Sequence, residues 1–202
     1  MKQSAGILLH RDRGQDVEVL LVHPGGPFWS RKDAGAWSIP KGEFLEDEEP
    51  FAAAKREFSE ELGLAVPEGE LKELGSVQQS GSKIVFAWAA HADLDIEAIK
   101  SNTFDLEWPP KSGQMKQFPE IDRAGWFTLD VAQTKLVKGQ VPLLQKLADA
   151  LGIDLPPAAK LELLPSTGPS SKISSGSKLK SKKEPKPDGK DSTSKEGQTS
   201  LF

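Results

Sequence analysis

The 202-residue chain contains no cysteine. Disulfide bonds, thiolate metal sites and cysteine nucleophiles are therefore excluded, and a reducing compartment is permitted. The first residues, MKQSAGILLHRDRG, contain too short an apolar run for a signal peptide. No segment approaches the roughly 20 apolar residues of a membrane span. We therefore expect a cytoplasmic protein without a membrane segment.

The absence of two further sequence patterns excludes other kinds of functional site. The three His residues are scattered without metal-binding spacing, and HPGGP at 23–27 lacks the Gly-Lys pair of a phosphate loop. The net charge is −4, and eight Lys face only four acidic residues from Ser166 onward, so the acidic excess belongs to residues 1–165. An acidic body does not favour strong nucleic-acid binding. It suits a site that holds divalent cations.

The composition divides the chain into unequal parts. Beyond Pro165, Ser, Lys, Gly and Pro dominate and apolar residues become scarce. Such a composition cannot offset the entropy of ordering a chain. We predict a folded domain over residues 1–152, a linker over 153–165 and a disordered tail over 166–202.

Hydrophobic patterning within the domain predicts an α/β fold. Helical spacing is found in two separate segments, 49–62 and 130–151. The segment 102–120 contains Pro109, Pro110 and Gly113 and has no clear hydrophobic period, so we expect a long loop there. Short apolar runs bounded by turn residues predict strands at 5–9, 17–22, 37–39, 71–79, 83–90 and 124–127.

The stretch GEFLEDEEPFAAAKREFSEELGL, residues 42–64, concentrates carboxylates around Arg56. On the expected helix, Glu57, Glu60 and Glu61 fall within an arc of about 100° beside the apolar stripe. One interpretation is a solvated acidic face with an Arg salt bridge. The other is a site for a hard divalent cation, which needs oxygen ligands and removes the repulsion between them. The tight loop at Gly42 favours the cation.

The same stretch is similar to the signature of the Nudix hydrolase family. Gly42 is followed after five residues by Glu48 and after seven more by REFSEELGL, residues 56–64, so that every defining position is filled. The resemblance implies an α/β/α sandwich with a mixed sheet. It also implies that Glu57, Glu60 and Glu61 bind Mg²⁺ or Mn²⁺, helped by a backbone carbonyl at Lys41 or Gly42. By the same resemblance Arg56 orients Glu57 or its neighbours, and Glu48 supports the loop or a second ion.

The implied activity is hydrolysis of a phosphoanhydride bond in a nucleoside diphosphate linked to another group. A carboxylate must accept the proton of the attacking water. Resemblance makes Glu57 the first candidate for this base and Glu120 the second candidate, as base or extra ligand. Lys41 is a candidate phosphate contact. Surface positions for Glu120 and Lys41 are the alternatives.

The sequence says less about the group that is linked to the nucleoside diphosphate. SIPKGE at 38–43 and GWF at 125–127 are similar to the branch that cleaves diadenosine tetraphosphate and related dinucleoside polyphosphates. Trp108, in the expected loop, is a candidate stacking surface for a base, and a core position is the alternative. Two other functions stay open: a housecleaning nucleoside triphosphate pyrophosphohydrolase recruited to the sliding clamp, and a non-catalytic Nudix domain that senses a nucleotide.

The pentapeptide QTSLF, residues 198–202, resembles the short peptides by which bacterial replication and repair proteins bind the DNA sliding clamp. In that resemblance Gln198 comes first and Leu201 and Phe202 last. A flexible linker would tether such a peptide to its pocket. The clamp is therefore the candidate protein partner, and a basic tail that keeps the protein soluble or contacts nucleic acid weakly is the alternative.

Overall fold

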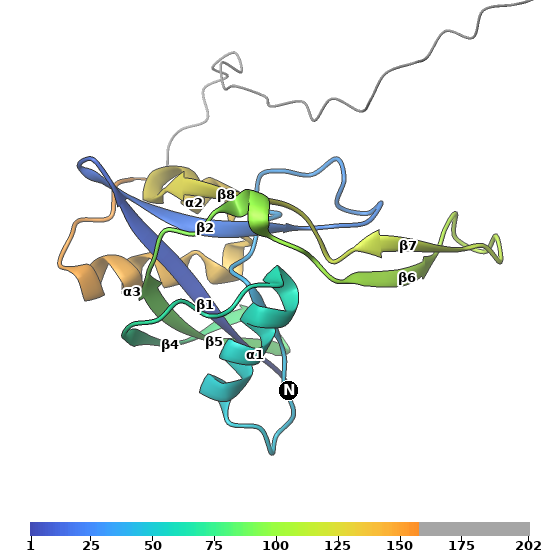
Figure 1. Cartoon of the computed structure of the whole chain (residues 1–202), viewed down its shortest axis with the longest axis horizontal. Coiled ribbons are helices and arrows are strands. Elements are labelled where there is room, and N and C mark those ends of the chain that lie inside the picture. Colours follow the sequence, from blue (N-terminus) through green and yellow to red (C-terminus); the bar gives the residue numbers. More distant parts are fainter. Residues whose placement is uncertain (158–202) are drawn as a thin grey trace, which may run out of the picture. The chain divides into compact units, whose positions relative to one another are not determined.

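A computed structural model describes residues 1–157 of the chain (Figure 1). The predicted tail, with its QTSLF segment, and most of the predicted linker lie outside these residues. The main sheet has the strand order β4-β5-β1-β2-β8, and β3 also pairs with β1. Its strands are β1 (Lys2–Arg13), β2 (Asp16–Pro24), β3 (Lys41–Glu43), β4 (Leu71–Ser80), β5 (Lys83–His91) and β8 (Ile121–Thr128).

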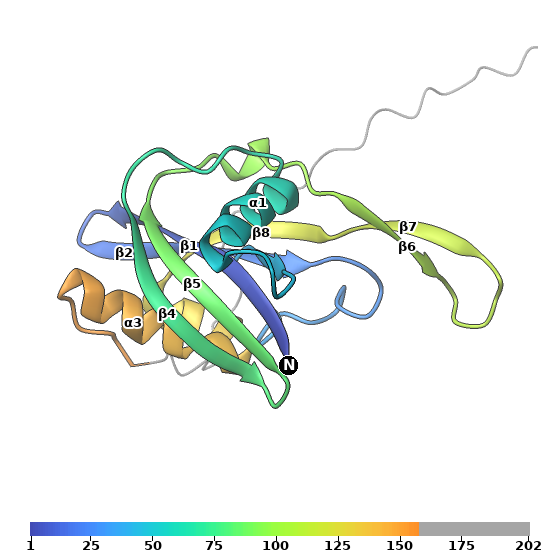
Figure 2. The same ribbon diagram turned by 90° about the horizontal axis from the view of Figure 1, so that it is seen from below.

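The sheet is mixed and is covered on both faces. β1 runs parallel to β5 and antiparallel to β2 and β3. Alternation along β1 sends Ile7 and Leu9 into the apolar cluster under α1 (Pro50–Leu62), and Leu8 into the opposite cluster with α3 (Pro142–Leu151). Figure 2 shows α1 and α3 on opposite sides of the sheet. The expected α/β/α sandwich is confirmed.

Helix α1 begins and ends where its sequence signals predict. The Glu49 side chain caps the start by accepting a hydrogen bond from the backbone N–H of Ala52 at 2.8 Å, and Pro50 occupies the first turn. Gly63 ends the helix in the left-handed conformation. Ala54, Phe58 and Leu62 form the buried stripe. Burial of this stripe presents the adjoining carboxylates at the edge of the core.

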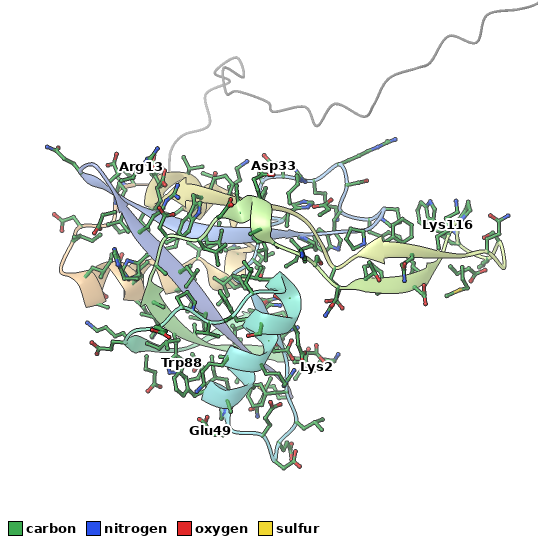
Figure 3. All side chains as sticks on the ribbon, in the orientation of Figure 1. Lys2, Arg13, Asp33, Glu49, Trp88 and Lys116 are labelled. Atoms are coloured by element: carbon green, nitrogen blue, oxygen red, sulfur yellow. The ribbon has the colours of Figure 1, made fainter. Side chains whose placement is uncertain are left out.

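The predicted long loop at 102–120 is wrong. This segment contains the hairpin β6 (Thr103–Glu107) and β7 (Met115–Pro119), which projects from the main sheet as an arm in Figures 1 and 2. Figure 3 places Lys116 on this arm, away from Glu49 at the start of α1. Phe104 and Phe118 pair across the two strands. The turn-forming residues that suggested a loop lie between the strands, so they interrupt neither of them.

Two further boundaries differ from the sequence expectations. Residues 37–39 form only isolated bridges, to β2 and Leu136, and the regular strand is β3 immediately after Pro40. The helical pattern of 130–151 is split into α2 (Leu129–Lys135), the 3-10 turn η2 (Lys138–Gln140) and α3. Pro142 lacks a backbone N–H and suits a helix start, which explains the break. A short 3-10 turn, η1 (Ile96–Ala98), follows β5.

No helix in residues 1–157 is long and apolar enough to cross a membrane.

Replacement of Leu147 by Ala tests the packing of α3. Leu147 is fully buried in the cluster beneath this helix, so we expect Leu147→Ala to lower the free energy of unfolding by about 2–5 kcal/mol. Leu151→Ala, one turn later on the same helix and 36% exposed, should cost less than about 1 kcal/mol. Urea denaturation measures both, and equal losses would contradict this packing.

Candidate active site on α1

The guanidinium of Arg56 binds three of the clustered carboxylates. It donates to both oxygens of Glu48 at 2.8 and 2.9 Å, to Glu57 at 2.6 Å and to Glu60 at 3.0 Å. These hydrogen bonds, led by those to Glu48, raise the pKa of Arg56 and lower the pKa of Glu48. Arg56 therefore ties the loop before α1 to the acidic face of the helix.

Glu57 lies against the backbone of β3. Its side chain is only 12% exposed. The backbone of Gly42 passes so close that a Cβ atom at this position would overlap the Glu57 carboxylate. Gly42 has no positive φ angle, so the glycine is required by space and not by backbone conformation. The first glycine of the signature is thus a cradle for the Glu57 carboxylate.

Glu61 is the most perturbed carboxylate of the site. Its Oε2 accepts a hydrogen bond from the backbone N–H of Lys41 at 2.8 Å. The pKa of Glu61 is raised to about 7, mainly by burial; Lys41 opposes this shift, and the charges of Glu57 and Glu120 contribute to it. The ionised form is therefore costly in the protein alone. A bound cation would stabilise that form.

A cavity of about 200 Å³ adjoins these groups. Lys41, Glu61 and Glu120 line it, and the other lining side chains are mostly apolar or aromatic, such as Trp29 and Ile39. Burial lowers the pKa of Lys41, while Glu61 opposes this effect. The cavity thus combines one cationic side chain and two carboxylates with an apolar wall.

The base of the β6–β7 arm positions Glu120. The backbone N–H of Glu120 donates to the carbonyl of Asn102, and its carbonyl accepts from the N–H of Gly25, both at 2.8 Å. A Cβ at Gly25 would overlap the carbonyl of Pro119, so the close approach requires glycine. The exposed Glu120 side chain is held in this way at the rim of the cavity.

The donor chemistry fits a divalent cation. Glu57, Glu60 and Glu61 supply carboxylate oxygens, which Mg²⁺ and Mn²⁺ prefer. Across residues 1–157, no three acidic, His or Cys side chains already converge in a metal-binding geometry. Arg56 bridges Glu57 and Glu60 here and supplies the positive charge. Each of these two carboxylates keeps a second oxygen outside its hydrogen bond with Arg56, and that oxygen would be available to a cation.

A family model described as the NUDIX domain matches residues 1–147. The chain belongs to the Nudix family. With every carboxylate of the signature present, the protein is a Nudix pyrophosphohydrolase. Nudix hydrolases generally use divalent metals such as Mg²⁺ or Mn²⁺.

Solved structures share the Nudix fold. An Ap4A hydrolase of C. elegans, solved as a binary complex, is 20% identical with a TM-score of 0.50, covering 75% of this chain and 98% of that one. The NUDIX domain of Shewanella oneidensis NrtR, complexed with ADP ribose, is 18% identical with a TM-score of 0.49, covering 74% and 87%. At these identities the likeness concerns the fold.

The tryptophan that lines the cavity is not the one that the sequence suggested. Trp108, the predicted stacking residue, is not among the residues that line this Nudix cavity within 1–157. Its ring packs edge-to-face on Phe28, with centroids 5.4 Å apart. Trp29 lines the cavity instead. The aromatic side chain available to a ligand there therefore comes from the loop after β2.

Several polar residues of the site carried no sequence signal. Ser38 and Gln79 line the cavity, and the fully buried Gln140 hydrogen-bonds both of them. His23 is also fully buried, between Asp122 at 2.6 Å and the carbonyl of Lys32 at 2.9 Å. Ser38 begins the SIPKGE segment, but Gln79, Gln140 and His23 belong to no local motif, so no spacing rule could have found these three.

Substitution of Gly42 tests the cradle of this Nudix site. Gly42→Ala should displace the Glu57 carboxylate and lower kcat for phosphoanhydride hydrolysis by roughly 100-fold. Gly81→Ala is the matched control, because a Cβ there meets no atom within 4 Å. Steady-state assays and circular dichroism of both variants make the comparison. Full activity of a folded Gly42→Ala enzyme would contradict the proposed contact.

Proposed function

We propose that the protein hydrolyses a phosphoanhydride bond in a nucleoside diphosphate-linked substrate, with dinucleoside polyphosphates such as diadenosine tetraphosphate as the substrate class, in a reaction that requires Mg²⁺ or Mn²⁺. The observation that carries this proposal is that Lys41, Glu61 and Glu120 line one cavity beside the Glu57 cradle. A polyphosphate needs cationic contacts, and an organic group needs the apolar wall.

Each residue of the cluster has a proposed role. Glu57, Glu60 and Glu61 hold the divalent cation, with a backbone carbonyl at Lys41 or Gly42 as a further oxygen donor. When bound, the metal offsets phosphate charge and acidifies water. Arg56 positions Glu57 and Glu60 through the hydrogen bonds described above.

The remaining roles concern charge and the proton. Lys41 neutralises part of the negative charge of the phosphate chain, because its half-buried amine lines the cavity. Glu57 accepts the proton of the attacking water, and Glu120, at the cavity rim, is the second candidate for this step. The two assignments predict different losses when each carboxylate is replaced in turn.

The choice of substrate class rests on sequence. SIPKGE at 38–43 supplies Ser38, Ile39 and Lys41 to the cavity wall, and GWF at 125–127 lies in β8. Both segments are similar to those of the dinucleoside polyphosphate branch. A housecleaning nucleoside triphosphate pyrophosphohydrolase is the second candidate, since such a substrate would use the same contacts. A purely sensing role is disfavoured because all the acids of the signature are present.

A substrate panel tests the proposal. The wild-type protein with Mg²⁺ or Mn²⁺ should release nucleotides from dinucleoside polyphosphates faster than from nucleoside triphosphates, nucleotide sugars or dinucleotide cofactors, as followed by chromatography. Glu60→Gln should lower kcat by roughly 100-fold or more, because it removes one cation ligand. Glu120→Gln should lower kcat by about 100-fold or more only if Glu120 is the base, because replacement of Glu57 would also remove a cation ligand. Nucleotide binding without turnover of any class would favour the sensor.

We further propose that QTSLF, residues 198–202, binds the sliding clamp. The support is its sequence alone, because these residues lie outside the described part of the chain. Full-length protein should show saturable binding to purified clamp by surface plasmon resonance. The double variant Leu201→Ala, Phe202→Ala should weaken the binding at least about tenfold. The double variant Ser192→Ala, Ser194→Ala is the control, and equal affinity of all three proteins would overturn the proposal.

A further inference from the structure

The wall of the cavity has one polar feature that the proposed hydrolysis does not use. Away from Lys41 and the two carboxylates, the lining consists mainly of apolar and aromatic side chains, with Ser38 and Gln79 as the polar exceptions. Cavities of about 150 Å³ bind benzene, so the 200 Å³ here accommodates a flat heteroaromatic ring. The polar atoms of this wall therefore decide which ring edge is accepted.

Gln140 sets the orientation of those polar atoms. It is fully buried, and its Oε1 accepts a hydrogen bond from the backbone N–H of Ile39 at 3.0 Å. A backbone N–H can only donate, so the Gln140 amide cannot be reversed at this contact. Its Nε2 therefore donates to the hydroxyl of Ser38 at 3.0 Å and to Gln79 at 2.8 Å.

The orientation of Gln140 in turn fixes that of Gln79. Because Gln140 presents a donor, Gln79 must present its Oε1 acceptor to it. The hydroxyl of Ser38 donates to the carbonyl of Ile39 at 2.8 Å, so its proton is also committed. Among the hydrogen bonds of residues 1–157, none is donated by the Nε2 group of Gln79. Gln79 thus directs its Oε1 towards Gln140 and keeps its Nε2 donors for a ligand in the cavity.

Two backbone features hold Gln79 beside Gln140. The register of β4 against β5 shifts between Gln78 and Ser80, which makes Gln79 a bulged residue. Bulges next to active sites commonly redirect a side chain. A Cβ at Gly139 would overlap the backbone of Gln79, so η2 approaches β4 closely only because residue 139 is glycine. The packing of η2 against β4 therefore holds the hydrogen-bonded side-chain amides of Gln140 and Gln79, here called the amide relay, in place.

We propose that Gln79 is a specificity residue whose amide N–H groups select a nucleobase with a keto oxygen, such as guanine or uracil. Gln140 is its positioning residue. This inference rests on the proposed function. Guanine presents two adjacent acceptors, O6 and N7, to such donors. Adenine places its N6 amino donor beside N7, where it would face the Nε2 donors of Gln79. The cavity therefore favours dinucleoside polyphosphates that contain a guanosine or uridine half.

Base preference in two variants tests this relay. Wild-type enzyme should show at least about tenfold higher kcat/KM for diguanosine than for diadenosine tetraphosphate, because the adenine amino group would oppose the Nε2 donors of Gln79. Gln79→Glu presents a carboxylate oxygen to the base while still accepting from Gln140, so the ratio should fall at least about tenfold. Gln140→Glu presents only acceptors, turns the Gln79 amide over and should lower the ratio in the same direction.

Gln78→Glu is the matched control. It makes the same chemical change at the adjacent exposed residue, which does not line the cavity, and should leave the ratio unchanged. Circular dichroism checks the fold of each variant. If the buried Gln140→Glu change prevents folding, Gln79→Glu decides the matter alone. An unchanged ratio in folded Gln79→Glu, or a wild-type ratio of one or less, overturns the inference.

Calorimetry separates this inference from the proposed hydrolysis. GDP and ADP are titrated into wild type, Gln79→Glu and Gln78→Glu in the presence of Mg²⁺. Tighter binding of GDP, lost only in Gln79→Glu, supports the base selection even if no substrate in the panel is hydrolysed. Equal affinities for the two nucleotides, or no binding of either, overturns it even if diadenosine tetraphosphate is hydrolysed.

Discussion

Repulsion among the carboxylates on one face of α1 is the constraint to which the rest of the site responds. Glu57, Glu60 and Glu61 are brought together by helical spacing, and burial makes the charge on Glu61 especially costly. Arg56 balances part of this charge by binding Glu57 and Glu60. Lys41 balances part of the charge on Glu61, and a further cation would balance the remainder. The cluster thus combines a destabilised carboxylate with oxygen donors that suit a divalent cation.

The sandwich keeps these charges in place. The buried stripe of α1 packs against the sheet, and β3 lies alongside so that Gly42 receives the Glu57 carboxylate. The N–H of Lys41 holds Glu61 at the same strand. Neither contact tolerates a rotation of α1, because the apolar stripe and the acidic arc are adjacent on one helix. Core packing and site geometry therefore depend on the same orientation.

Contacts made by segments that follow α1 in the sequence shape the rest of the cavity. The β6–β7 arm delivers Glu120 to the rim through its backbone hydrogen bonds with Asn102 and Gly25. The close contact of η2 with β4 delivers Gln140 to Gln79. The proposed phosphate chemistry and the proposed base selection thus depend on different elements. Changes at one side can in principle leave the other intact.

The sequence by itself determined the local features. Helix α1, its caps and the shared face of Glu57, Glu60 and Glu61 follow from spacing and residue type, as do the main strands, because these depend on neighbours in the chain. Only the tertiary structure decided that Trp29 and not Trp108 lines the cavity, and that Gln79 meets Gln140 across 61 residues. The sequence did not predict the hairpin at 103–119, because the Pro and Gly residues of its turn are also typical of a long loop. Contacts between distant segments depend on strand register and close glycine packing, which no local pattern encodes.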